Sequence, residues 1–462
     1  MSFTSPTYYL AFLAFLLVFQ SLPQPRIRQL LLLAGSYAFY LAFDWRFGIL
    51  LFAQTTICFW AGRHLEPTSH RRPYWCWGCC LFSLGVLGWF KYYNFFAESF
   101  SRLLQGLHLP YLIPHLNILL PVGISFFTFQ SLGYVFDVYR GIIKAERDFA
   151  VFALFVAFFP QLAAGPIGRA GELLPQLRTL EKPSSEKVYD GLRQIIWGLF
   201  KKVVVADRLA FYVDIAFSHP ETSSSATLLL AACFFSLQIY CDFSGYSDIA
   251  IGSARLLGVE LRKNFDFPYF ATSIGEFWKK WHISLTSWFR DYLYIPLGGN
   301  RCSKLRWMLN IMAIFLASGL WHGANWTFLV WGGLHGVLYL VEIALRGKKP
   351  IACYFFSRLG YWLLTMALVT LAWIFFRAPS FTVARQIITG IVNWHGRLSF
   401  GPSQLTFLLD GVATLLFAVV EWNMFRIKTT NNIWLQAAGY SGLLVIISLL
   451  GMTSESFIYL QF

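Results

Sequence analysis

The sequence predicts an all-helical protein that crosses a membrane many times. Of its 462 residues, 57% are hydrophobic and only 13% are charged, whereas soluble domains carry roughly 25% charged residues. Apolar runs recur along the whole chain, so one large soluble core does not explain the low charge. Aromatic residues make up 19% of the chain, and such rings favour membrane interfaces and the walls of apolar tunnels.

The formal net charge of +14 also fits a membrane protein. Lys and Arg cluster in short loops between apolar runs, as in the cytoplasmic loops of inner-membrane proteins, and we expect no nucleic-acid partner. The eight cysteines form no framework, because Cys76-x-x-Cys79-Cys80 lacks a second pair, and no metal site is predicted. The chain shows no phosphate-binding loop and no dinucleotide fingerprint, which disfavours a nucleotide-driven pump.

About twelve transmembrane helices are expected, since a span needs roughly 20 apolar residues and fewer where its flanks snorkel. Segment 94–111 is amphipathic, 149–164 is broken enough to be re-entrant, and 190–217 is apolar but carries charges that must face protein, water or headgroups. The candidate spans cover residues 6–22, 29–43, 47–62, 74–91, 116–139, 226–254, 307–322, 325–345, 358–376, 405–425 and 433–451.

The basic loops predict the orientation of the chain in its membrane. An excess of Lys and Arg marks the cytoplasmic side, and both termini then lie on the outer side. Residues 8–22 are expected to stay as a first span, because no basic segment or cleavage site accompanies them. Three arginines on the outer side, Arg377, Arg385 and Arg397, count against this orientation. The basic loops are 26–28, 63–72, 140–147, 167–190, 255–306, 346–349 and 426–428.

One histidine, His282, lies in a charged and aromatic stretch. Ser273-x-x-Glu276 is a capping-box pattern, and the apolar positions after it recur at helical spacing. We therefore expect one amphipathic helix that ends by Pro296, with His282 and Arg290 on its polar stripe. Such a helix could line a funnel or lie in the membrane interface, where the histidine would be solvated.

A second histidine, His322, lies in an apolar stretch within Gly319-x-x-x-Gly323. Small residues at this spacing let helices approach closely, and an ionisable side chain at membrane depth is a functional candidate. An imidazole is suited to proton transfer near neutral pH. The alternative is a structural histidine bonded to a neighbouring helix, and we assign His335 to such packing or to a supporting role.

Two carboxylates, Asp242 and Asp248, end an apolar run. They could orient an imidazole, or they could pair with Lys279, Lys280 or Arg290. The neighbouring Cys241 has no base positioned beside it by the sequence, so a thioester nucleophile is disfavoured.

Two functions fit buried histidines without a metal cluster or nucleotide loop. A histidine could act as general base on a hydroxyl that attacks an activated acyl group. It could equally relay protons in a multi-span transporter or exporter of a polymer or lipid-linked precursor that performs no acyl chemistry. The residue pattern alone leaves both functions open.

Several long motifs resemble the membrane-bound O-acyltransferase superfamily. WHISLTSWFRDYLYIPLGGNR (281–301) and GLWHGANW (319–326) carry this resemblance. Its bacterial branch, which acetylates alginate, peptidoglycan or cellulose and more distantly D-alanylates teichoic acids, is indicated by SFFTFQSLGYVFDVYRG (125–141), FFPQLAAGPIGR (158–169), GLFKKVVVADRLA (198–210) and YCDFSGYSDIAIG (240–252).

The resemblance implies helices arranged around a waist, with funnels from both faces meeting at a thin central tunnel. It places His322 in the tunnel and His282 on its cytoplasmic side. The donor substrate would be a cytoplasmic acyl-CoA such as acetyl-CoA, with no bound cofactor, and the acetyl group would pass to a periplasmic SGNH-type acetyltransferase that modifies a polymer. The supporting or tunnel-lining residues would be Trp321, Asn325, Asp242, Asp248, Trp281 and Arg290.

The C-terminal residues 456–462 resemble a terminal aromatic-Tyr-aromatic motif of the same branch. Tyr459 could accept the acyl group as an ester, with His322 as its base, or it could be an interfacial anchor. We expect N-terminal transmembrane helices in 1–115, the catalytic core in 116–345, and C-terminal helices with the tail motif in 346–462. Direct acylation of a lipid or protein is a further alternative, and the polymer and the acyl length stay open.

Overall fold

The computed structural model describes residues 4–65, 71–109, 113–162, 165–346, 355–399, 404–426 and 433–452. Within these ranges the chain folds into helices and contains no strand, which confirms the all-helical prediction. The chain divides into two compact units, one formed by the chain up to Gly191 with Ser253–Arg262, the other by Leu192–Gly252 and Lys263 onward. The division at residues 115 and 345 stays a prediction.

Long apolar helices confirm a multi-pass membrane protein. Four helices in the described ranges are long and apolar enough to cross a membrane: Ser225–Leu256, Trp326–Leu345, Phe356–Arg377 and Thr406–Phe425. Shorter apolar helices are Pro6–Ser21, Phe149–Leu162, Phe381–Val392 and Gln436–Leu450.

The first unit contains mostly short helices whose starts follow local rules. Proline occupies the first turn of α1, α2 and α4, where its missing N–H costs nothing. The predicted span 116–139 starts later than expected, because Pro121 precedes a left-handed Gly123 and α6 begins only at Ile124. The helices are α1 (Pro6–Ser21), α2 (Pro25–Leu41), α3 (Trp45–Arg63), α4 (Arg72–Leu87), the π-helix η1 (Gly88–Tyr92), α5 (Tyr93–Gly106), α6 (Ile124–Tyr139), α7 (Phe149–Ala157), α8 (Phe159–Leu162) and α9 (Ala170–Thr179).

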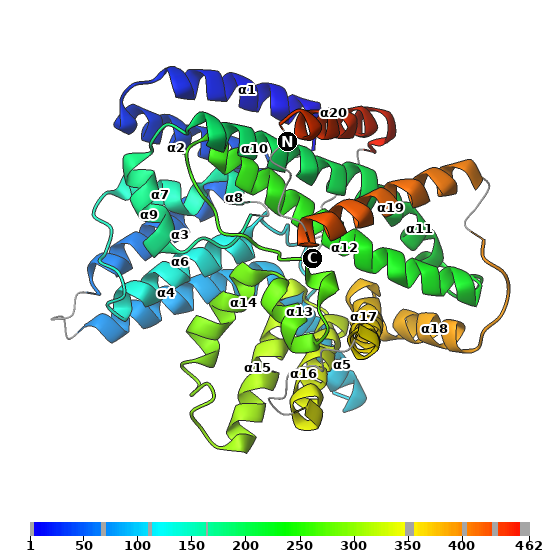
Figure 1. The fold of residues 1–462 in the computed structure, drawn as a ribbon. Helices are drawn as coiled ribbons and strands as arrows, with labels where there is room; N and C mark the ends of the chain where they lie inside the picture. The colour runs from blue at the N-terminus through cyan, green and yellow to red at the C-terminus, as the bar shows by residue number, and fades with distance from the viewer. Residues whose placement is uncertain are drawn as a thin grey trace. The chain divides into compact units, whose positions relative to one another are not determined.

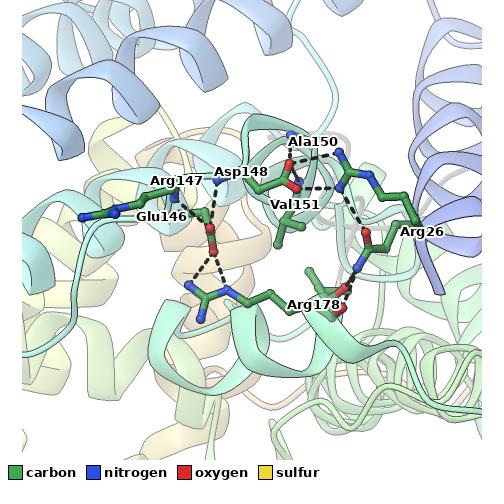
Figure 2. A network of polar contacts seen from close by, with 9 residues as sticks. Arg26, Glu146, Arg147, Asp148, Ala150, Val151 and Arg178 are labelled. Atoms are coloured by element: carbon green, nitrogen blue, oxygen red, sulfur yellow. Dashed lines mark hydrogen bonds and ion pairs between the residues drawn. The ribbon is translucent and has the colours of Figure 1, made fainter.

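A polar network ties the loop before α7 to α2 and α9 (Figure 2). Asp148 caps α7 by accepting the N–H groups of Ala150 and Val151, and it pairs with Arg26 at 2.6 Å. Burial favours a higher pKa for Asp148, but Arg26 and the two N–H groups outweigh it and hold that pKa below its usual value. In the same loop, the buried Glu146 pairs with Arg178 of α9 at 2.7 Å.

The second unit holds the stretch with both histidines. Two helices start in one unit and end in the other: α10 (Ser185–Leu199), whose last residues belong here, and α12 (Ser225–Leu256), whose last residues belong to the first unit. The other helices are the π-helix η2 (Phe200–Ala206), α11 (Asp207–Ser218), the 3-10 turn η3 (Pro268–Phe270), α13 (Ile274–Lys280), α14 (Ile283–Phe289), the π-helix η4 (Arg290–Tyr294), α15 (Lys304–His322), α16 (Trp326–Arg346), α17 (Phe355–Arg377), α18 (Phe381–Val392), α19 (Gln404–Arg426) and α20 (Ile433–Leu450).

Glycines bring α15 and α16 into close contact, and the two helices lie side by side in Figure 1. A Cβ on Gly319 would overlap the carbonyl oxygen of Phe328, and a Cβ on Gly332 would overlap that of Phe315. Backbone therefore packs directly on backbone. This confirms the close approach predicted from the glycine spacing, and it holds the C-terminal end of α15, where His322 lies, against α16.

Candidate functional site

The predicted single amphipathic helix around His282 is wrong, because the helix breaks there. Ser273 caps α13 as expected, by accepting the N–H of Glu276. The N–H of Ile283 then donates to the backbone oxygen of Asn264 at 2.9 Å instead of continuing the helical ladder. His282 adopts a left-handed conformation with φ of 45°, which costs on the order of 1 kcal/mol for a non-glycine residue, and α14 begins at the next residue.

The break turns His282 into the protein. Its side chain is fully buried, with 0% exposure, so it does not lie on a polar stripe and is not a solvated interfacial histidine. Its ring packs at right angles on Phe243 of α12, with the ring centroids 4.6 Å apart. His282 lies outside the candidate membrane spans, and burial lowers its pKa to about 3, so the imidazole is neutral.

Asn264 holds His282 in place. Its side-chain oxygen lies 3.2 Å from Nδ1 of His282, and it also accepts the backbone N–H and the hydroxyl of Ser284 at 3.2 and 2.9 Å. Its side-chain nitrogen donates to the hydroxyl of Ser247 on α12 at 3.3 Å. Asn264 is itself 1% exposed, so this cluster of hydrogen bonds is shielded from water.

His322 is the last residue of α15 and is 2% exposed. Its ring centroid lies 5.0 Å from that of Trp331 on α16 and 5.4 Å from that of Phe376 on α17. The rings of His282 and His322 are 6.2 Å apart, and Trp321 packs on both at 5.7 and 5.0 Å. Two imidazoles forty residues apart in the chain thus share one buried aromatic cluster.

His335 lies at the edge of this cluster, where its ring packs on those of Trp331 and Trp278. It is fully buried, and its Nδ1 accepts the indole N–H of Trp278 at 3.3 Å. An indole N–H can only donate, so Nε2 carries the proton in a neutral His335. The packing or supporting role of His335 stays a prediction.

The predicted partners of Asp242 and Asp248 are wrong. Both carboxylates pair with lysines of the π-helix η2: Asp242 with Lys202 at 2.5 Å, and Asp248 with Lys201. Lys202 also pairs with Asp207 at 2.7 Å. The wider turn of a π-helix presents two consecutive lysines to α12, so these carboxylates pair with buried cations of η2 instead of the predicted lysines and arginine near His282.

Glycines allow this pairing. Gly198 on α10 and Gly245 on α12 face each other, and a Cβ on either would approach the other's carbonyl oxygen to 2.6–2.7 Å. Only glycine permits this approach of the two backbones, which brings the lysines of η2 within reach of α12.

The remaining predicted site residues do not form one group. Trp281 is fully buried, stacks on Phe277, and packs on Trp373 with the two rings tilted by 51°. Asn325 caps α16 by accepting the N–H of Thr327 at 3.1 Å, and it donates to the oxygen of Pro379. Arg290 pairs with Asp291, and its side chain is 63% exposed. Tyr459 lies outside the described residues.

Sequence reasoning missed Asn264 and the roles of Lys201 and Lys202. The paired lysines within the apolar segment 190–217 were the available signal, because charges there need partners. No comparable signal marks Asn264, whose importance depends on hydrogen bonds to residues 18 and 20 positions later.

Comparison with known proteins supports an acyltransferase over a transporter. Residues 143–383 match the family model of MBOAT, the membrane-bound O-acyltransferase family. The chain is 39% identical over 441 residues to the "Probable alginate O-acetylase AlgI" of Azotobacter vinelandii, covering 93% of this chain and 85% of that protein.

Two further relatives carry related names. The "Peptidoglycan O-acetyltransferase" of Helicobacter pylori is 33% identical over 83% of this chain and 77% of its own length. The "Teichoic acid D-alanyltransferase" of Bacillus subtilis is 28% identical over 50% of this chain and 60% of its own length. The chain therefore belongs to the membrane-bound O-acyltransferase family, and it is a multi-pass membrane O-acyltransferase.

Proposed function

We propose that this enzyme takes an acetyl group from acetyl-CoA at the cytoplasmic face of the bacterial inner membrane and passes it outward for O-acetylation of an extracytoplasmic polysaccharide. The observation that carries the proposal is the pair of buried imidazoles, His282 and His322, with rings 6.2 Å apart. The names of the relatives, which refer to alginate and peptidoglycan, support a polymer as the final acceptor.

The chemistry requires one base and a dry site. His322 takes the proton of an acceptor hydroxyl as that oxygen attacks the thioester carbonyl. The new C–O bond forms, the C–S bond breaks, and the proton passes from His322 to the departing thiolate, giving an acetyl ester and CoA–SH. The apolar shell of Trp331 and Phe376 around His322 excludes water, which would otherwise hydrolyse the thioester.

The remaining residues have supporting roles in this proposal. His282 lies on the donor side and accepts or returns protons there. Trp321 contacts both histidine rings and keeps them in one cluster, and Trp281 extends that cluster toward Trp373. Asp242 and Asp248 act at a distance, by binding η2 to α12.

The acetyl group leaves on the periplasmic side, where both termini lie in the proposed orientation. Tyr459 accepts it as a phenyl ester, with His322 as base, and a periplasmic SGNH-type transferase takes it from there to the polymer. In that second step the polymer hydroxyl gains the acetyl group and the phenol of Tyr459 regains its proton.

Turnover of acetyl-CoA by the purified protein in liposomes tests whether the protein transfers acetyl groups from this donor. With acetyl-labelled acetyl-CoA supplied on one side, we expect release of CoA and label transferred to the protein or to an added acceptor. If neither CoA release nor transferred label exceeds that of empty liposomes, acetyl-CoA is not the donor.

A tyrosine variant tests the outward relay separately. Tyr459→Phe removes the acceptor hydroxyl and keeps the ring, so label on the protein and acetylation of the polymer in cells should both be lost. Polymer acetylation equal to that of the unsubstituted protein, at matched amounts in the membrane, would remove the covalent step through Tyr459 and leave the rest of the proposal standing.

A further inference from the structure

The hydrogen bonds of Asn264 determine which of its side-chain atoms is oxygen. The backbone N–H of Ser284 lies 3.2 Å from one of them. A backbone N–H can only donate, so the atom it meets must be the oxygen. The amide is thereby oriented by a neighbour that has no alternative hydrogen-bonding role, and its nitrogen points to the hydroxyl of Ser247.

The oriented amide determines the tautomer of His282. The same oxygen lies 3.2 Å from Nδ1 of His282, and an oxygen lone pair can bond only to a protonated ring nitrogen. A neutral imidazole has one proton. With that proton on Nδ1, the lone pair is on Nε2.

We propose that Asn264 is a positioning residue that holds His282 in the Nδ1–H tautomer and so makes Nε2 its proton-accepting nitrogen. The inference rests on the proposed role of His282 in acyl transfer. Asn264 also keeps the ring in place, because its backbone oxygen accepts the N–H of Ile283 and so maintains the left-handed turn at His282. Both the tautomer and the direction of the ring follow from one residue.

Side chains of α12 and α15 face the ring of His282, and burial among them lowers its pKa. From α15, the imidazole of His322 and the indole of Trp321 face the ring. From α12, Phe243 packs on it, and the adjacent Asp242 is paired with a lysine of η2. A charge placed at Asn264 would therefore act on His282 directly, at hydrogen-bond distance.

Nitrogen-15 NMR of the full-length protein in bilayers, with labelled histidine, reads the tautomer. The signals of His282 are assigned as those that disappear in His282→Asn. We expect a protonated Nδ1 and an unprotonated Nε2 in the parent protein, and a shift toward Nε2–H in Asn264→Leu. A proton on Nε2 in the parent, or an unchanged tautomer in Asn264→Leu, would overturn the inference.

A charge-changing variant separates positioning from simple packing. Asn264→Asp keeps the acceptor oxygen but places a carboxylate beside the ring, so the acid limb of the pH–rate profile should move up by about 1–3 pH units. Asn264→Leu should lower acetyl transfer by roughly 100-fold. Ser287→Ala, one turn along α14 from Ser284, removes a hydroxyl that donates to the backbone oxygen of Ser284, and it should leave both the rate and the profile unchanged.

The outcomes distinguish this inference from the proposed function. If Asn264→Asp leaves the pH profile where it was while folding normally, Asn264 is a packing residue only. If His282→Asn transfers acetyl at the parent rate, the proposed role of His282 fails, whereas the NMR result still decides whether Asn264 sets the tautomer.

Discussion

Lys202 and Asp242 form a buried ion pair with 2.5 Å between Nζ and Oδ1, and each side chain is nearly inaccessible to water. The pair joins η2 to α12, the helix that also presents Phe243 to His282. Because Lys202 binds a second buried carboxylate, Asp207, it is the cation between two anions. The charges of this cluster therefore support the shape of the site by joining η2 to α12.

Removing the cation should be far worse than removing a surface charge. Lys202→Met leaves two buried carboxylates without their cation, and we expect a loss of about 3–5 kcal/mol of stability. Arg102→Met is the control: it breaks an exposed pair with Glu98 and should cost less than about 0.5 kcal/mol. Unfolding of the two variants in detergent measures both, and equal stabilities would contradict the buried-cluster account.

Neighbouring glycines on α16 provide a matched test of helix packing. Gly332→Ala places a methyl group against the backbone oxygen of Phe315, whereas Gly333→Ala meets only Leu316 at 3.6 Å. We expect the first to lose about 1–3 kcal/mol of stability and much of the acyl transfer, and the second to be neutral or slightly stabilising. Thermal unfolding and transfer rate check this, and two variants that behave alike would show that the contact is not tight.

The pairing of Asp148 with Arg26 should make stability depend on pH (Figure 2). A carboxyl whose pKa is depressed in the folded state stabilises the protein above its unfolded pKa of about 3.9, and the contribution is lost as pH falls through the lower folded value. Asp148→Asn keeps a capping oxygen but no charge. The stability difference should be at most about 1 kcal/mol, because both side chains are partly exposed.

That difference should be greatest near neutral pH and shrink as the pH falls below about 4. Unfolding of the parent and Asp148→Asn proteins across this range measures it. A difference that stays constant, or grows, on acidification would mean that the carboxylate of Asp148 is not stabilised by Arg26.

The helical, multi-pass fold could be predicted because apolar run length is a local property of the chain. The expected span 307–322 corresponds to α15 (Lys304–His322), and the glycine spacing around His322 correctly predicted a close helix contact. The sequence signal for the start of a helix was also correct, because Ser273 caps α13 as the capping-box pattern predicted.

The interior of the site could not be predicted, because it depends on contacts between distant residues. Helical periodicity placed His282 on a polar stripe, but the backbone oxygen of Asn264 takes the N–H of Ile283 and ends the helix. In the same way, the basic residues around His282 were the predicted partners of Asp242, whereas its observed partner is Lys202 of the π-helix η2. Sequence periodicity assumes an unbroken helix, and it does not show when a distant residue takes a hydrogen bond or an ion pair from that helix.

The rate of acetyl transfer by His322→Gln tests the central claim most directly. Its matched control is His335→Gln, a buried histidine of the same cluster whose hydrogen bond from Trp278 a glutamine oxygen can still accept. With equal amounts of folded protein and acetyl-CoA as donor, we expect His322→Gln to be slower by about 10²–10⁴-fold and His335→Gln to keep most of the parent rate. A His322→Gln protein that transfers acetyl at the parent rate would contradict the assignment of His322 as the base.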